Sequence, residues 1–158
     1  MHLTIVVLTM LIIPLFCVYA QKNGDEQLIP LIGKWFLFWG AGVRLTIAGI
    51  RQIIAPQLTV EGIFGVHDPR IWPLAQELGF WNLSVGILCM VTLLRYEWRQ
   101  VLALASGLFF LAAGVKHVLS DHRTLEANTA MVSDIGIAAV LLGFAAFSAL
   151  VSKNSGHK

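Results

Sequence analysis

The chain has 158 residues, of which 57% are hydrophobic and only 13% are charged, and its formal net charge is +2. A soluble domain is typically about 45–50% apolar and about 25% charged, so the composition excludes an ordinary soluble domain. The small net charge, without a basic patch, gives no reason to expect a nucleic-acid partner. Cys17 and Cys89 lie inside apolar runs and form neither a disulfide framework nor a CxxC metal motif.

Five apolar runs dominate the sequence, and each is close to the roughly 20 residues that a helix needs to cross a bilayer. These runs must be helical in a membrane because lipid offers no partner for an exposed backbone N–H or C=O. We therefore predict an all-α fold: a polytopic transmembrane helical bundle of about five spans, forming a single membrane domain over residues 1–158. The predicted spans cover residues 3–20, 31–55, 78–94, 101–119 and 129–151.

The first run, residues 3–20, contains no charged side chain, and Pro14 is expected to kink its helix. A cleaved signal peptide ending at CVYA is the alternative to a membrane span. The run lacks the basic n-region of a signal peptide and its apolar core is long, which favours the span.

The second run, residues 31–55, carries Arg44 and Arg51, which are seven residues apart and therefore share one helix face. A turn-rich loop over residues 56–76 follows this helix. Arg51 is therefore expected near the end of the helix, and Arg44 nearly two turns deeper. Trp72 in the loop stands where an aromatic residue of the membrane interface is expected.

The remaining runs bring further polar side chains to the same end of the bundle. Glu77 precedes the third run and Asn82 lies just over one turn inside it. Lys116 and His117 end the fourth run, and Asp134 lies about one turn into the fifth. With five spans, all these groups fall in the same half of the bilayer as the two arginines of the second run.

A charge inside a membrane costs at least about 2.5–3.5 kcal/mol at a helix centre, so these groups require partners. One hypothesis is a structural ion-pair network in which Arg51 is the direct partner of Glu77. Arg44 would then reach Asn82, Asp134 or a ligand. The other hypothesis is a polar cavity that holds an anion, a lipid headgroup or a quinone. The candidate ligand-binding residues are Arg44, Arg51, Glu77, Asn82, Lys116, His117 and Asp134.

Glycines recur seven residues apart within the runs, so each pair lies on one helix stripe. Such stripes let membrane helices approach closely, and they favour a compact left-handed bundle. The pairs are Gly33 and Gly40, Gly42 and Gly49, Gly79 and Gly86, Gly107 and Gly114, and Gly136 and Gly143.

Several histidines lie at the same end as the polar groups and raise the question of a metal site. Two or three imidazoles with a carboxylate can bind zinc, copper or iron; the candidate ligands are His117, Asp121, His122 and His67. Their spacing matches no strong metal motif, so we predict no tightly bound transition metal. The sequence identifies no cofactor. It also lacks a nucleophile elbow, a phosphate-binding loop and an HExxH motif, and so gives no support for an enzymatic activity.

Two stretches, QELGFWNLSVGIL over residues 76–88 and AAGVKHVL over residues 112–119, resemble a family of small uncharacterised bacterial membrane proteins. The family shows an E-x-G-F-x-N-L-x-x-G stretch and a later G-x-x-H pair. The family implies no established activity. Its layout is similar to that of small four-helix membrane proteins linked to quinone-coupled oxidoreductases. The matching positions are Glu77, Gly79, Phe80, Asn82, Leu83, Gly86, Gly114 and His117.

The distribution of basic residues predicts how the chain is oriented. Positive charge marks the cytoplasmic side of a membrane protein. The C-terminus is therefore expected in the cytoplasm, because six basic residues lie on its side: Lys22, Lys34, Arg95, Arg99, Lys153 and Lys158.

These observations together predict a small bacterial inner-membrane binding or accessory protein with a polar site in the outer half of the bundle. The alternatives are a structural subunit of a larger membrane complex and a membrane metalloprotein. The expected partners are the lipid bilayer, a small ligand or quinone, and other membrane proteins or a second copy of the chain.

Overall fold

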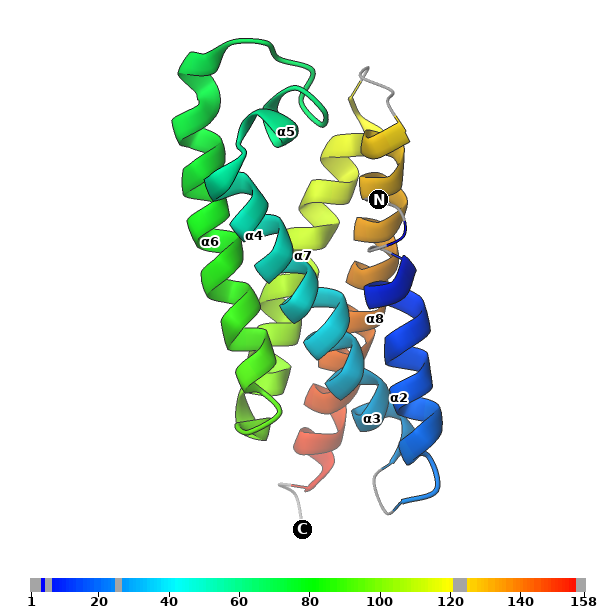
Figure 1. Cartoon of the computed structure of the whole chain (residues 1–158). Helices are drawn as coiled ribbons and strands as arrows, with labels where there is room; N and C mark the ends of the chain where they lie inside the picture. The colour runs from blue at the N-terminus through cyan, green and yellow to red at the C-terminus, as the bar shows by residue number, and fades with distance from the viewer. Residues whose placement is uncertain (1–3, 5–6, 25–26, 121–124, 156–158) are drawn as a thin grey trace.

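The computed structural model describes residues 4, 7–24, 27–120 and 125–155, and most of them lie in helices (Figure 1). No β-strand occurs among these described residues. The predicted all-α bundle is therefore confirmed.

The first helix begins as a π-helix, η1 (Leu8–Ile12), and continues directly as α2 (Ile13–Gln21). Pro14 lies in the first turn of α2 and has no N–H to donate to the preceding turn. The sequence predicted a kink at Pro14. The irregularity found beside it is this π-helical stretch, whose hydrogen bonds reach one residue further than in an α-helix.

The second helix is continuous but has three parts, α3 (Leu28–Trp35), the π-helix η2 (Phe36–Val43) and α4 (Arg44–Ile54). The π-helical part ends at the residue before Arg44. π turns are rare and often lie at functional sites, and this one changes the direction in which the following side chains point.

The rest of the chain consists of short helices and three long ones. α6 begins earlier than its predicted span because Pro73 occupies the first turn, where a missing N–H costs nothing. The remaining elements are α5 (Gln57–Val60), η3 (Pro69–Ile71), α6 (Trp72–Val91), η4 (Tyr96–Trp98), α7 (Arg99–Val118) and α8 (Leu125–Ser155).

Within the described part of the chain, four helices are long and apolar enough to cross a membrane, which indicates a membrane protein. They overlap the second to fifth predicted runs. In the first run, residues 3, 5 and 6 lie outside the described residues, and its described helix has five residues in η1 and nine in α2, so the first span stays a prediction. At 1.5 Å per residue this helix covers about 20 Å of the roughly 30 Å of a bilayer core. The four candidate spans are Leu28–Ile54, Pro69–Val91, Tyr96–Val118 and Ala127–Val151.

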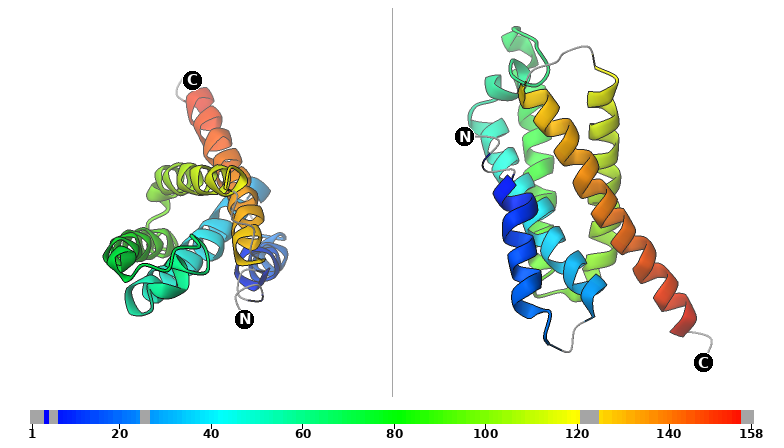
Figure 2. Two further views of the ribbon diagram at one scale, coloured as in Figure 1. Left: turned by 90° about the horizontal axis from the view of Figure 1, so that it is seen from above. Right: turned by 90° about the vertical axis from the view of Figure 1, so that its right-hand side faces the viewer.

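The two ends of the bundle carry different connections. Figure 1 shows α5 at the same end as the last turn of α7 and the first turn of α8. The connection from α6 to α7 and the last turns of α8 lie at the other end. The loops after the second and fourth runs therefore share one end, as predicted. Figure 2 shows α8 crossing the bundle obliquely, with its second half leaning away from the other helices.

The predicted glycine stripes bring the second helix, in η2 and α4, into backbone contact with α6. A Cβ atom added to Gly49 would lie 2.7 Å from the carbonyl oxygen of Gly79. One added to Gly86 would lie 2.8 Å from the carbonyl oxygen of Gly42. Neither position has room for a side chain, so the two helices pack at the distance that their backbones set.

Two further glycine pairs also pack as predicted, and one does not. The pairs Gly33 with Gly40 and Gly107 with Gly114 lie against side chains of α8, including Phe144, Ile137, Leu142 and Ile135. The prediction is wrong for the pair in α8 itself. A Cβ on Gly136 would meet only Met10, at 3.8 Å, and one on Gly143 would meet nothing within 4 Å.

This difference predicts opposite effects for the same substitution. Gly49→Ala should lower the free energy of unfolding by about 1–3 kcal/mol because the new methyl group overlaps backbone atoms. Gly143→Ala should leave it unchanged or raise it by up to about 1 kcal/mol through helix propensity. Thermal unfolding in detergent, followed by tryptophan fluorescence, measures both. Equal destabilisation by the two variants would contradict the packing described.

Candidate functional site

A cavity of about 260 Å³ lies between the long helices near the end of the bundle that carries α5. α4, α6, α7 and α8 form its walls, and α5 and the loop after it cover it. Six of the seven ligand-binding residues predicted from the sequence line this cavity: Arg44, Arg51, Asn82, Lys116, His117 and Asp134.

Arg44 is the most completely bonded of these side chains. Its Nη2 atom donates to Asp134 Oδ1 at 2.5 Å and to Ser133 Oγ at 2.8 Å. Its guanidinium carbon lies 4.9 Å from the centre of the Phe110 ring, and its Nη1 atom lies 3.5 Å from the sulfur of Met10. Arg44 thus connects the second helix to α8, α7 and the N-terminal helix.

Asn82 is bonded on one side only. Its Nδ2 atom donates to Gln52 Oε1 at 2.8 Å, which links α6 to α4. Its Oδ1 atom is buried and has no hydrogen-bond partner in the described structure. An unpaired buried acceptor costs about 1–3 kcal/mol. The cavity wall therefore includes a residue whose carboxamide oxygen is buried and unpaired.

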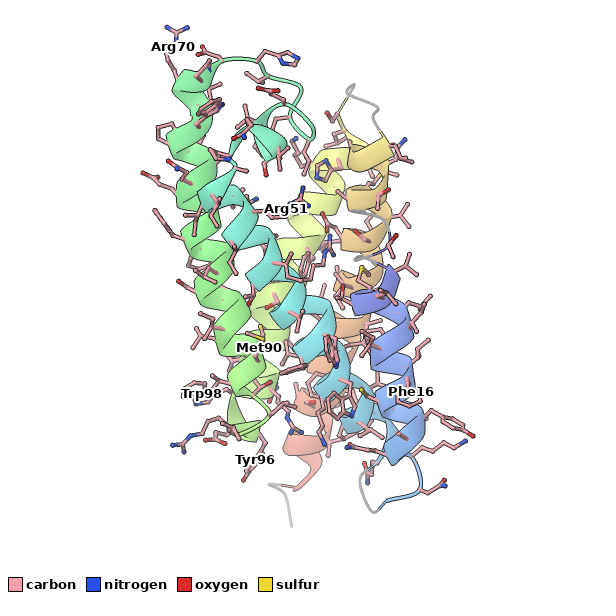
Figure 3. The ribbon with its side chains drawn as sticks, viewed as in Figure 1. Phe16, Arg51, Arg70, Met90, Tyr96 and Trp98 are labelled. Carbon is pink, nitrogen blue, oxygen red and sulfur yellow. The ribbon has the colours of Figure 1, made fainter. Side chains whose placement is uncertain are left out.

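Two cations in the cavity wall lack an acidic partner. Arg51 is half-buried on the side of α4 that faces α7 (Figure 3). Lys116 is on α7, and its Nζ atom lies 4.8 Å from the centre of the Phe64 ring in the covering loop. Within residues 7–24, 27–120 and 125–155, neither cation forms a salt bridge.

Glu77 does not take the place predicted for it. Its side chain is exposed and does not line the cavity. Among the described residues it forms no ion pair with Arg51, so the predicted direct pair is wrong. Glu77 begins a helix stripe that faces away from α4, whereas Gln76 beside it donates to the backbone oxygen of Ile53 at 3.1 Å.

The described residues hold no group of three His, Cys, Asp or Glu side chains that could bind a metal ion. His117 lines the cavity, but His67 lies in the covering loop, 3.9 Å from a carboxylate oxygen of Glu61. The other candidate ligands, Asp121 and His122, lie outside the described residues. The absence of a tightly bound metal stays a prediction.

The loop next to His67 is closed by a charged pair. Asp68 accepts hydrogen bonds from the side chain and the backbone N–H of Arg70, at 2.7 and 3.0 Å. These bonds hold the pKa of Asp68 below its usual value. The carboxylate of Asp68 is therefore committed to the start of η3, away from the cavity.

A second cavity of about 460 Å³ adjoins the first on the α5 side. Arg51 and Gln52 line both cavities, so they mark the boundary between them. Glu61 lines only the second cavity. The two cavities therefore lie side by side between α5 and the buried polar groups.

Sequence reasoning missed several residues of this site. Charged residues were predicted because a charge is costly inside a membrane. Gln52 and Ser133 are uncharged and were therefore not predicted, yet both form hydrogen bonds with predicted site residues. Phe64 is apolar and gave no sign of a role at the site, yet its ring lies 4.8 Å from Lys116 Nζ. The position of Gln52, one residue after Arg51 on the same helix, is the one signal that could have indicated it.

A family model described as "Family of unknown function (DUF6790)" matches residues 1–154. The chain belongs to this family. The match agrees with the resemblance to uncharacterised proteins in residues 76–88 and 112–119, and it assigns no activity. No curated protein and no solved structure matches the chain.

The geometry of Arg44 predicts a strong energetic coupling with Asp134. Arg44→Met and Asp134→Leu should each lower the free energy of unfolding by about 3–5 kcal/mol because each leaves one buried charge unpaired. The double variant should cost clearly less than the sum of the two. Thermal unfolding of the purified variants in detergent gives the values.

Arg51→Met is the matched control for Arg44→Met, since Arg51 belongs to the same helix face and has no acidic partner in the described chain. It should cost much less stability. A loss as large as that of Arg44→Met would show that the ion pair with Asp134 is not what makes Arg44 important.

Proposed function

We propose that this chain is a small multi-pass protein of a bacterial inner membrane that binds a small ligand in the cavity between α4, α6, α7 and α8. The observation that carries the proposal is the cavity itself. One space of about 260 Å³ gathers polar side chains that come from four helices and lie far apart in the sequence.

The size and the walls of the cavity support a ligand rather than a space filled by the protein. Ligand pockets typically have volumes of about 300–1,000 Å³, with mostly apolar walls and a few polar groups that fix orientation. The cavity is close to this range, and Leu45, Phe109 and Phe110 supply apolar wall. The adjoining cavity gives a ligand a way in.

The two alternative functions gain no comparable support. A structural subunit would use its polar network for assembly, but Arg44 and Asp134 are satisfied within this chain. For a metalloprotein, only His117 of the candidate ligands lines the cavity, and Asp121 and His122 lie outside the described residues.

The binding proposal is tested by filling the cavity. Ala113 lines the cavity on α7, whereas its neighbour Ala112 is exposed. Small molecules that copurify with the protein in detergent are extracted and measured by mass spectrometry. A ligand should be retained by the wild type and by Ala112→Trp, and lost from Ala113→Trp. Identical profiles for all three proteins would overturn the proposal.

The orientation of the chain has its own test. We propose that the end carrying α5 faces the outer compartment and that the C-terminus is cytoplasmic, because basic residues concentrate at the other end. Cysteines introduced at His67, Leu125 and Tyr96, all exposed positions, are labelled in intact cells with an impermeant reagent. The first two should react and the third should not. Labelling at only one of His67 and Leu125 would contradict the prediction that these two positions face the same compartment.

A further inference from the structure

The charges that line the cavity do not balance. Asp134 neutralises Arg44 at 2.5 Å. Arg51 and Lys116 remain without an acidic partner in the described chain, and both line the same cavity. Of the described acidic residues nearby, Glu61 lines the outer cavity together with Arg51 without forming an ion pair with it, and Glu77 lines neither cavity.

Unpaired cations beside apolar walls favour an anionic occupant. The guanidinium of Arg51 presents a planar fork of N–H donors that matches a carboxylate or a phosphate. Lys116 supplies a second positive charge from the facing helix, α7. Since Arg51 also lines the outer cavity, an anion bound to it would lie at the junction of the two spaces.

Asn82 adds a second and independent requirement. Its side chain belongs to a residue that is only 4% exposed, and its Oδ1 atom lacks a donor. A ligand that satisfies Asn82 must carry an N–H or an O–H group. A quinone ring offers only acceptor oxygens, so it leaves this atom unpaired.

Resting on the proposed function, we infer that the ligand is a small organic anion with a carboxylate or phosphate head and one hydrogen-bond donor. The head lies between Arg51 and Lys116, the donor reaches Asn82 Oδ1, and the remaining apolar part lies against the Phe109 and Phe110 side of the cavity. A volume of about 260 Å³ fits a molecule with one aromatic ring and its substituents.

The test uses probes of one size and different chemistry. Isothermal titration calorimetry is carried out on the full chain in phosphatidylcholine nanodiscs with 4-hydroxybenzoate, benzoate, phenyl phosphate and hydroquinone. We expect 4-hydroxybenzoate to bind at least tenfold more tightly than benzoate, which lacks the donor, and than hydroquinone, which lacks the charge. Comparing phenyl phosphate with benzoate shows whether the site prefers a phosphate or a carboxylate head. A second titration uses nanodiscs that contain phosphatidic acid. If the phosphate head of this lipid reaches the site, it should compete with 4-hydroxybenzoate and weaken its binding.

Four variants assign the contacts. Arg51→Gln and Lys116→Gln should each weaken 4-hydroxybenzoate at least tenfold, and Arg51→Lys should recover part of the loss. Asn82→Ala should weaken 4-hydroxybenzoate and leave benzoate unchanged. Arg95→Gln, an exposed cation at the other end of the bundle, is the control and should change nothing.

Three results would overturn the inference. The first is hydroquinone binding as tightly as 4-hydroxybenzoate, and the second is binding of 4-hydroxybenzoate that does not depend on Arg51 and Lys116. The third is no binding of either acid at millimolar concentration. In each case the proposed function stands if Ala113→Trp still removes a copurifying molecule, and it falls if that variant and the wild type retain the same copurifying molecules.

Discussion

The need to pair Arg44 inside an apolar bundle is the constraint on which the rest of the structure depends. Its ion pair with Asp134 joins the second helix to the last one, which are distant in sequence and do not share a loop. Because either charge alone would be costly in this environment, the pair fixes the rotation of both helices. The cavity lies beside this pair, and Asp134 is thereby removed from the set of groups available to a ligand.

Most of the architecture was predictable from the sequence because it depends on patterns that repeat along the chain. The apolar runs predicted the four long helices, and the cost of a charge in lipid predicted that the polar residues would meet at one end. Helical periodicity placed Gly42 and Gly49 on one stripe, and the structure shows that stripe in contact with α6. The common location of six predicted polar residues follows from the same reasoning.

What could not be predicted depends on contacts between particular side chains. A sequence shows that Arg51 and Glu77 carry opposite charges, but not that the helix rotation turns Glu77 outward. The π-helical stretches before Pro14 and before Arg44 were also not predictable, because they have no pattern as regular as an apolar run. The prediction for Gly136 and Gly143 was wrong for a related reason, because their spacing places them on one stripe of α8 but does not show whether another helix packs against that stripe.

The backbone contact between α4 and α6 has a consequence for how this family can evolve. At Gly49 and Gly79 each glycine occupies the space that a side chain on the other would need. A single substitution in either helix pushes the two helices apart, and a second substitution opposite it cannot restore the contact because it adds further bulk. Single substitutions at these two positions are therefore selected against, whereas Gly143 has room for a side chain. The glycines therefore keep the distance between the two helices constant within the family, and the width of the cavity beside them stays constant as well.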